Sequence, residues 1–194
     1  YDVTVIAIGT AGVVSNTSIS LDVLVLYSPP AELLEAMYTG SWRVKAEEFG
    51  HMGVGPSDLD TPDWWQAAAF DKVDTGMYDD RYTFTPDGIL TVETFGSIFG
   101  KAPPLADEFV GDQGPEANGN NEYEYYPTED FTSNWTIGAP GGEEHIYLDG
   151  NGFFGFYVGG THAYKIIDSS SNTLTLKTVG FEGLAWYIIL TNEQ

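Results

Sequence analysis

The chain has 194 residues, and its 29 acidic residues against 7 basic ones give a formal net charge of −22. This charge repels nucleic-acid phosphates and anionic lipid headgroups, and it disfavours anionic polysaccharides unless calcium or a local basic patch intervenes. The chain lacks cysteine, which excludes disulfides and thiolate metal sites, and it contains no apolar run long enough to insert into a membrane.

The N-terminal region predicts a β-hairpin followed by a short helix. Residues 2–9 and 17–27 are rich in Val, Ile and Thr and flank a glycine-containing turn. A lone hairpin is marginal in water, so these strands are expected to complete a sheet of another domain. Two prolines then precede the amphipathic segment 31–38, which predicts a linker helix within residues 29–40. Because Tyr1 falls in what reads as mid-strand, we expect the chain to be a piece of a longer protein.

From Ser41 to the C-terminus the apolar side chains recur at every second position, in short runs joined by Gly, Asp and Asn turns. This pattern predicts one all-β domain over residues 41–194, most simply an antiparallel β-sandwich. A lipocalin-like closed barrel is the alternative, which the Ser41-Trp42 start and a meander strand order permit. The alternation places Trp42, Trp135 and Trp186 on the apolar, core-facing side of their strands.

Two long connections, from about residue 49 to 77 and from about 97 to 128, break the short-loop pattern, and long loops are often functional. The first contains Trp64 and Trp65, which no alternating run claims for the core. An indole is a flat apolar plate that can stack on the C–H face of a pyranose. These residues therefore predict a binding surface for a neutral glycan, although they could instead pin the loop to the domain.

Other residues of the two connections complete the predicted site. Gln66 and Lys72 follow the tryptophans and are expected to bind sugar hydroxyls, and His51 is expected to border the site. In the second connection, Tyr125 and Tyr126 are amphipathic side chains that suit a sugar or protein surface. Packing of that loop on itself is the alternative for the two tyrosines.

The sequence contains candidate residues for metal binding and no motif for catalysis. Asp79, Asp80 and Asp149 are possible calcium ligands, because calcium prefers loop carboxylates, but the EF-hand spacing is absent. No other cofactor is indicated. No nucleophile elbow, phosphate-binding loop, dinucleotide fingerprint or metal-protease motif is present. We therefore expect a non-catalytic domain, although it could be one part of a multimodular glycoside hydrolase.

Four segments carry a resemblance to a known family: residues 40–56 (GSWRVKAEEFGHMGVGP), DWWQA, GMYDDRYTF and GLAWYIILT. They resemble the β carbohydrate-binding module that follows a PKD-type Ig-like domain in bacterial surface glycan-binding lipoproteins and laminarin-degrading multimodular enzymes. Residues 1–28 are similar to the last strands of such an Ig-like domain.

This resemblance implies binding of a β-glucan such as laminarin without catalysis, outside the cell or at the bacterial outer-membrane surface. A neighbouring Ig-like domain or an outer-membrane glycan-uptake complex would be the partner. Two other classes remain open from the residues alone. One is a glycoside hydrolase or lyase. The other is a structural or adhesion module whose aromatic residues form a protein interface.

Overall fold

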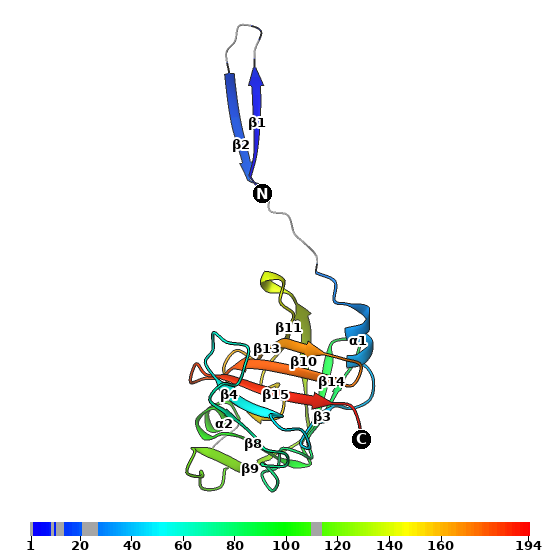
Figure 1. Cartoon of the computed structure of the whole chain (residues 1–194), viewed down its shortest axis with the longest axis vertical. Coiled ribbons are helices and arrows are strands. Elements are labelled where there is room, and N and C mark those ends of the chain that lie inside the picture. Colours follow the sequence, from blue (N-terminus) through cyan, green and yellow to red (C-terminus); the bar gives the residue numbers. More distant parts are fainter. Residues whose placement is uncertain (1, 9, 11–13, 21–26, 110–113) are drawn as a thin grey trace.

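The computed structural model describes residues 2–8, 10, 14–20, 27–109 and 114–194 (Figure 1). The chain is an all-β protein with mostly antiparallel sheets arranged as a sandwich, as the alternation predicted. The ten strands of the large sheet are β3 (Arg43–Val44), β4 (Met52–Gly55), β5 (Trp65–Gln66), β6 (Arg81–Phe84), β7 (Ile89–Glu93), β10 (Phe131–Gly138), β11 (His145–Leu148), β13 (Ala163–Ser169), β14 (Thr173–Val179) and β15 (Ala185–Thr191). The three strands of the small sheet are β8 (Gly96–Lys101), β9 (Glu122–Thr128) and β12 (Phe156–Tyr157).

The N-terminal hairpin and the linker helix are present. Strand β1 (Asp2–Ile8) pairs with β2 (Val14–Ser20), so the second strand begins three residues earlier than the alternation indicated. Residues 21–26, which the prediction gave to that strand, lie outside the described part of the chain. Helix α1 (Ala31–Met37) confirms the predicted linker helix. Its last residue accepts a hydrogen bond through its carbonyl from Trp42 Nε1 at 3.1 Å, which anchors the helix to the β domain.

The large sheet runs in the order β5-β4-β15-β14-β13-β11-β10-β7-β6, with β3 also paired to β15. An isolated bridge between Trp42 and Tyr82 brings the β6 edge back towards β3. The two backbone hydrogen bonds of that bridge, at 2.8 and 2.9 Å, are not continued as a strand ladder. The described strands therefore do not form a closed barrel, and the lipocalin-like alternative is wrong.

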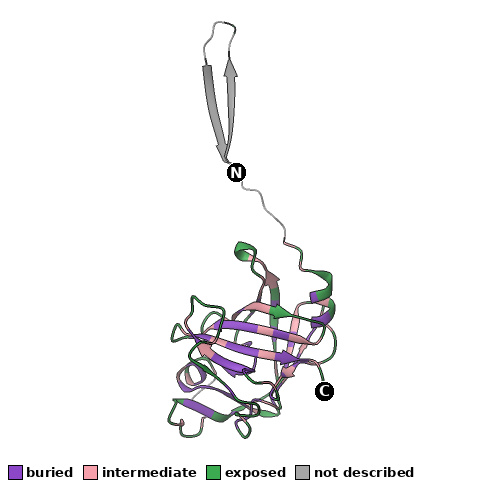
Figure 2. Ribbon diagram, viewed as in Figure 1, coloured by how far each residue is buried: buried purple, intermediate pink, exposed green. Residues whose placement is uncertain are grey.

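The core follows from the alternation. Trp42, Tyr82 and Leu90 are fully buried, and so are the even-numbered residues Leu174 and Leu176 of β14. Figure 2 shows buried positions along the strands and exposed ones in the connecting loops. The core contains many aromatic rings in tilted or edge-to-face contact, an arrangement that stabilises beyond the area buried.

The two long connections are not structureless. The first contains β4 and the edge strand β5, and the second contains β8, helix α2 (Ala102–Glu108) and β9. A short 3-10 turn, η1 (Pro140–Gly142), precedes β11. Strands of only two to seven residues give little periodicity, so the sequence pattern alone did not separate them from loops. The small sheet packs on the core face of the large one through Phe156, whose ring centroid lies 4.6 Å from that of Phe99 and 4.9 Å from that of Trp186.

Candidate functional site

Strand register places an aromatic row across one edge of the large sheet. Trp65 of β5 pairs with Val54 of β4, and Val54 pairs with Trp186 of β15. Directly paired residues present their side chains on the same face of a sheet. The two indoles therefore share the core face at the point where the sandwich opens, with the smaller valine between them.

This row is one wall of a groove with a volume of about 440 Å³, within the range of small-ligand sites. We call it the tryptophan groove. It is lined by Met52, Val54, Trp65, Asp71, Lys72, Lys101, Asn120, Glu122 and Trp186. The apolar residues come from β4, β5 and β15, whereas the polar ones come from the loop after β5 and from the β8–β9 side.

The charges of the tryptophan groove are arranged as two ion pairs. Lys101 Nζ lies 3.3 Å from Glu122 Oε1 and donates to the Asn120 carbonyl at 3.1 Å. Lys72 Nζ lies 3.5 Å from a carboxylate oxygen of Asp71. Each ammonium also lies near an indole, Lys72 at 5.0 Å from the Trp65 ring centroid and Lys101 at 5.3 Å from that of Trp186. Such cation–π contacts add an attraction between the aromatic and the polar groups of the groove.

Trp186 is a groove residue that the sequence pattern assigned to the core. The alternation gave the correct face, since Trp186 points to the same side as Ile188 and Leu190, but the indole is only partly buried. It lies at the end of the core face, between Phe156 and the Lys101 ammonium, and so forms part of the groove wall. Periodicity identifies the face of a strand and carries no information on where the opposing layer ends.

Of the two adjacent tryptophans, only Trp65 lines this groove. Both side chains are accessible, Trp64 at 59% and Trp65 at 37%, so the alternative in which they pin the loop by burial is wrong. The prediction that no strand contains them is also wrong for Trp65, which begins the edge strand β5. Trp64 precedes that strand, and its amide donates to the Val54 carbonyl at 3.2 Å.

Lys72 was correctly expected beside the tryptophans, whereas Gln66 points elsewhere. Gln66 pairs with Gly53 and therefore lies on the sheet face opposite to Trp65. Its Oε1 lies over Gly50, 2.7 Å from where a Cβ of that residue would stand. Gln66 is thus exposed but does not contribute to the tryptophan groove.

His51 does not border the groove as expected, because its side chain is fully buried. Nδ1 lies 2.7 Å from the Glu48 carbonyl, and Nε2 lies 2.7 Å from the Tyr78 hydroxyl. The Tyr78 hydroxyl also accepts the backbone N–H of Lys72 at 2.8 Å, so His51 reaches the groove through one intermediary. Burial lowers the pKa of His51 below its usual range, because charge is disfavoured away from water.

The two predicted tyrosines, which are consecutive in β9, do not line the tryptophan groove, and one side chain is exposed whereas the other is buried. Tyr125 is 50% exposed, and its amide donates to the Thr75 carbonyl at 2.9 Å. Its φ of 54° places it in the left-handed region, an outlier for a bulky residue. Tyr126 is buried, and its ring is stacked with that of Tyr123 at 5.5 Å.

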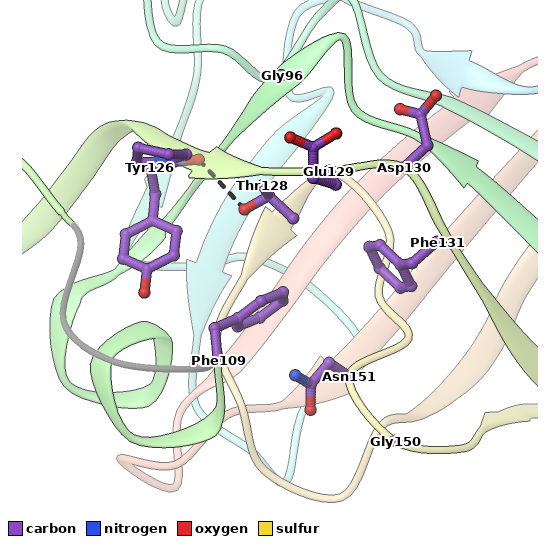
Figure 3. Close-up of a pocket in the computed structure, with 10 residues that line it drawn as sticks. Gly96, Phe109, Tyr126, Thr128, Glu129, Asp130, Phe131, Gly150 and Asn151 are labelled. Atoms are coloured by element: carbon purple, nitrogen blue, oxygen red, sulfur yellow. Dashed lines mark hydrogen bonds between the residues drawn. The ribbon is translucent and has the colours of Figure 1, made fainter.

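Tyr126 instead lines a second, larger hollow of about 680 Å³ (Figure 3). The rings of Phe109 and Phe131 face this hollow with centroids 6.4 Å apart, and the Asn151 amide lies at its rim. In Figure 3 the side chains of Glu129 and Asp130 point away from the rings. This hollow offers aromatic surface with few polar groups directed inward, whereas the tryptophan groove combines both, as ligand sites usually do.

The three aspartates considered for calcium are separated. The Asp80 carboxyl is buried and accepts from the Tyr82 hydroxyl at 3.2 Å, while Asp79 and Asp149 are exposed. The backbone carbonyls of residues 78–80 converge on one guanidinium nitrogen of Arg81, at 2.8 to 3.2 Å. Among the described residues, no group of three or more acidic, histidine or cysteine side chains is placed to hold a metal ion. Calcium binding stays a prediction that this geometry does not favour.

Comparison with known proteins adds no family. No protein-family model matches the chain, and no curated protein is similar to it. Within the described residues, neither helix has the length and hydropathy needed to cross a bilayer.

Proposed function

We propose that the chain binds a neutral polysaccharide, without catalysis, in the tryptophan groove. The observation that carries this proposal is the position of Trp65. Its accessible indole stands at the edge of a groove that is also lined by two lysines, two acidic residues and Asn120. A sugar ring has one apolar face and an equatorial belt of hydroxyls, so it needs an aromatic surface flanked by such hydrogen-bonding groups.

The electrostatics of the groove favour a ligand without charge. Each lysine is paired with a carboxylate, so the groove carries little net charge of its own. The remaining surface is strongly acidic, which penalises an anionic chain and leaves a neutral one unaffected. Neutral hydroxyls can accept from the Lys72 ammonium, which has no hydrogen-bond acceptor closer than Asp71 among the described contacts.

The same pairing supports binding over hydrolysis. Glycosidases generally use one protonated carboxylic acid and one ionised carboxylate on either side of the scissile bond. In the groove, Glu122 contacts both Lys101 and the Asn118 amide, each at 3.3 Å, and Asp71 contacts Lys72. Both carboxylates of the groove are therefore already engaged by a neighbouring lysine.

The resemblance in the sequence extends the proposal to a β-glucan such as laminarin. It also extends it to an extracellular or outer-membrane location, and to an Ig-like neighbour whose sheet the β1–β2 hairpin would complete. The hairpin pairs only within itself among the described strands, which leaves both of its edges open for such pairing. We expect a single module to bind its glycan with a micromolar to millimolar dissociation constant, which corresponds to a binding free energy of about 4–8 kcal/mol.

Affinity electrophoresis against laminarin, xylan, mannan and alginate tests the proposal. Trp65→Ala should weaken retardation by the preferred neutral glycan by about tenfold or more, equivalent to about 1.4 kcal/mol. Trp64→Ala is the matched control, because this neighbouring indole is more exposed yet lies outside the groove. Equal loss in both variants, or none in either, would contradict the assignment of the groove.

A protein-binding module is the second candidate, favoured by exposed aromatic side chains outside the groove, including Phe49 and Phe95. That function predicts no retardation by any glycan and a stable oligomer in size-exclusion chromatography with light scattering. A glycoside hydrolase, in contrast, predicts release of reducing sugar from the polysaccharide that is retained.

A further inference from the structure

A chain of partly buried hydrogen bonds passes through the buried His51 ring and ends at the tryptophan groove. It runs from the Glu48 carbonyl through the His51 ring and the Tyr78 hydroxyl to the backbone amide of Lys72. Its three distances are 2.7, 2.7 and 2.8 Å. The His51 and Tyr78 rings are also in edge contact, with centroids 5.4 Å apart. The chain therefore consists of short, well-packed contacts.

The direction of each hydrogen bond follows from which atoms carry protons. The Lys72 amide can only donate, so the Tyr78 oxygen accepts from it. The Tyr78 O–H then donates to His51 Nε2, which must be unprotonated to accept it. The proton of a neutral His51 therefore sits on Nδ1 and is donated to the Glu48 carbonyl. The geometry thus selects one neutral tautomer of the imidazole.

The segment held by this chain is the polar wall of the groove. Lys72 supplies the ammonium beside Trp65, its neighbour Asp71 is the paired carboxylate, and the Lys72 carbonyl accepts from Thr75 Oγ1 at 2.8 Å. Phe70 and Asp74 flank the segment with φ of 57° and 63°. Backbone of this kind is strained in residues other than glycine and persists only where surrounding contacts enforce it. The Tyr78 hydrogen bond is one such contact.

Protonation of His51 is incompatible with the chain as it stands. Nε2–H would become a donor facing a hydroxyl that already accepts from Lys72, and the Tyr78 proton would lose its acceptor. A charged imidazole would also be buried, which carries a large desolvation cost. If Tyr78 moves away from His51, the Nε2–H no longer faces the hydroxyl and the Tyr78 proton is free to find another acceptor. The same movement breaks the hydrogen bond from the Lys72 amide to the Tyr78 oxygen.

We propose that His51 and Tyr78 position the Lys72 wall of the tryptophan groove, so that protonation of His51 weakens glycan binding. This inference rests on the proposed function for its effect on binding, although the movement of the wall itself does not require a ligand. His51 and Tyr78 are positioning residues, since neither lines the groove. The site would then hold its ligand near neutral pH and release it in acid.

The charges around His51 set the pH at which this occurs. Burial is the largest influence and lowers the pKa of His51; the Glu48 carbonyl and the carboxylates of Asp71 and Glu47 partly oppose it, and the Lys72 ammonium adds to it. Affinity should therefore be constant above about pH 6.5, the usual histidine value, and should fall only below it. Loss of one net hydrogen bond in the wall corresponds to a fall of about fivefold.

The experiment has two readouts on the whole chain between pH 4.5 and 8. The first is affinity electrophoresis with the glycan that wild type retains best. The second, without ligand, is the ¹H–¹⁵N signal of the Trp65 indole, assigned with Trp65→Phe. Both should titrate together in wild type. In His51→Gln, whose Oε1 can still accept from Tyr78 but cannot titrate, this transition should disappear. His145→Gln, which alters a histidine of the β11 surface, is the matched control and should behave as wild type.

Tyr78→Phe should lower affinity at all pH values and abolish the His51-dependent transition, with its fold checked by circular dichroism. Retained binding with a pH profile that is the same in wild type and His51→Gln would refute the positioning role and leave the proposed function intact. Absence of glycan binding at every pH would instead refute the proposed function. In that case the indole signal decides. If the pH dependence of the Trp65 indole signal is the same in wild type and His51→Gln, this inference is overturned as well. If His51→Gln abolishes that pH dependence, His51 positions the Lys72 wall.

Discussion

The Lys101–Glu122 ion pair of the tryptophan groove provides a quantitative test of how dry that groove is. The two side chains are only 11% and 8% exposed, and the charged atoms lie 3.3 Å apart. At an effective dielectric constant of about 20, their Coulomb attraction is about 5 kcal/mol. Most of this attraction is offset by the cost of removing both charges from water, so the intact pair adds little net stability.

Removing one partner has a different consequence. Lys101→Met leaves the Glu122 carboxylate buried with only the Asn118 amide at 3.3 Å, and the stability should fall by about 3 kcal/mol, the lower end of the range for a broken buried pair. The double variant Lys101→Met/Glu122→Gln has no unpaired charge. Its loss should be only about 1 kcal/mol, since it lacks the hydrogen bond to the Asn120 carbonyl.

Urea denaturation followed by circular dichroism measures these free energies of unfolding. Lys45→Met is the matched control, because Lys45 pairs with Glu48 at 2.7 Å on the surface and such pairs contribute less than about 1 kcal/mol. A Lys101→Met variant no less stable than the Lys45→Met control would refute the reasoning. So would a double variant that recovers none of the loss. Either result would mean that water reaches Glu122 freely.

Two further predictions concern the core. Trp42→Ala should destabilise the domain by about 3–5 kcal/mol, because the fully buried indole also fixes helix α1, and a thermal melt checks it. Asp80→Asn should stabilise the protein at pH 7 by about 1–3 kcal/mol, because it removes a buried charge whose one hydrogen bond, from the Tyr82 hydroxyl, leaves the other carboxyl oxygen without a partner. Burial raises the pKa of Asp80 above its unfolded value of about 3.9, so the wild type loses stability as the pH rises through this window. The advantage of Asp80→Asn should therefore vanish near pH 4; an advantage that grows in acid would show that the sign is wrong.

Replacement of Trp186 should differ in its effect from replacement of a tryptophan that lies wholly in the core. A core tryptophan should affect stability alone when replaced, as is expected of Trp42. Trp186 instead contacts Phe156 in the core and the Lys101 ammonium in the groove, so it belongs to both. The sequence pattern treats the two residues alike because each occupies an apolar position of an alternating run.

The sequence by itself determined the all-β class, the linker helix, and the accessibility of Trp64 and Trp65 with Lys72 near them. These features are local, because side-chain alternation and helix periodicity depend only on neighbours within a few residues. Which of the predicted residues converge was decided only by the tertiary structure. Trp65 and Trp186 lie in one row, on either side of Val54, because of pairing between three strands, and the β8–β9 ribbon brings Lys101 and Glu122 against them. Strand register and layer edges depend on contacts between residues far apart in the chain, and no local pattern specifies them.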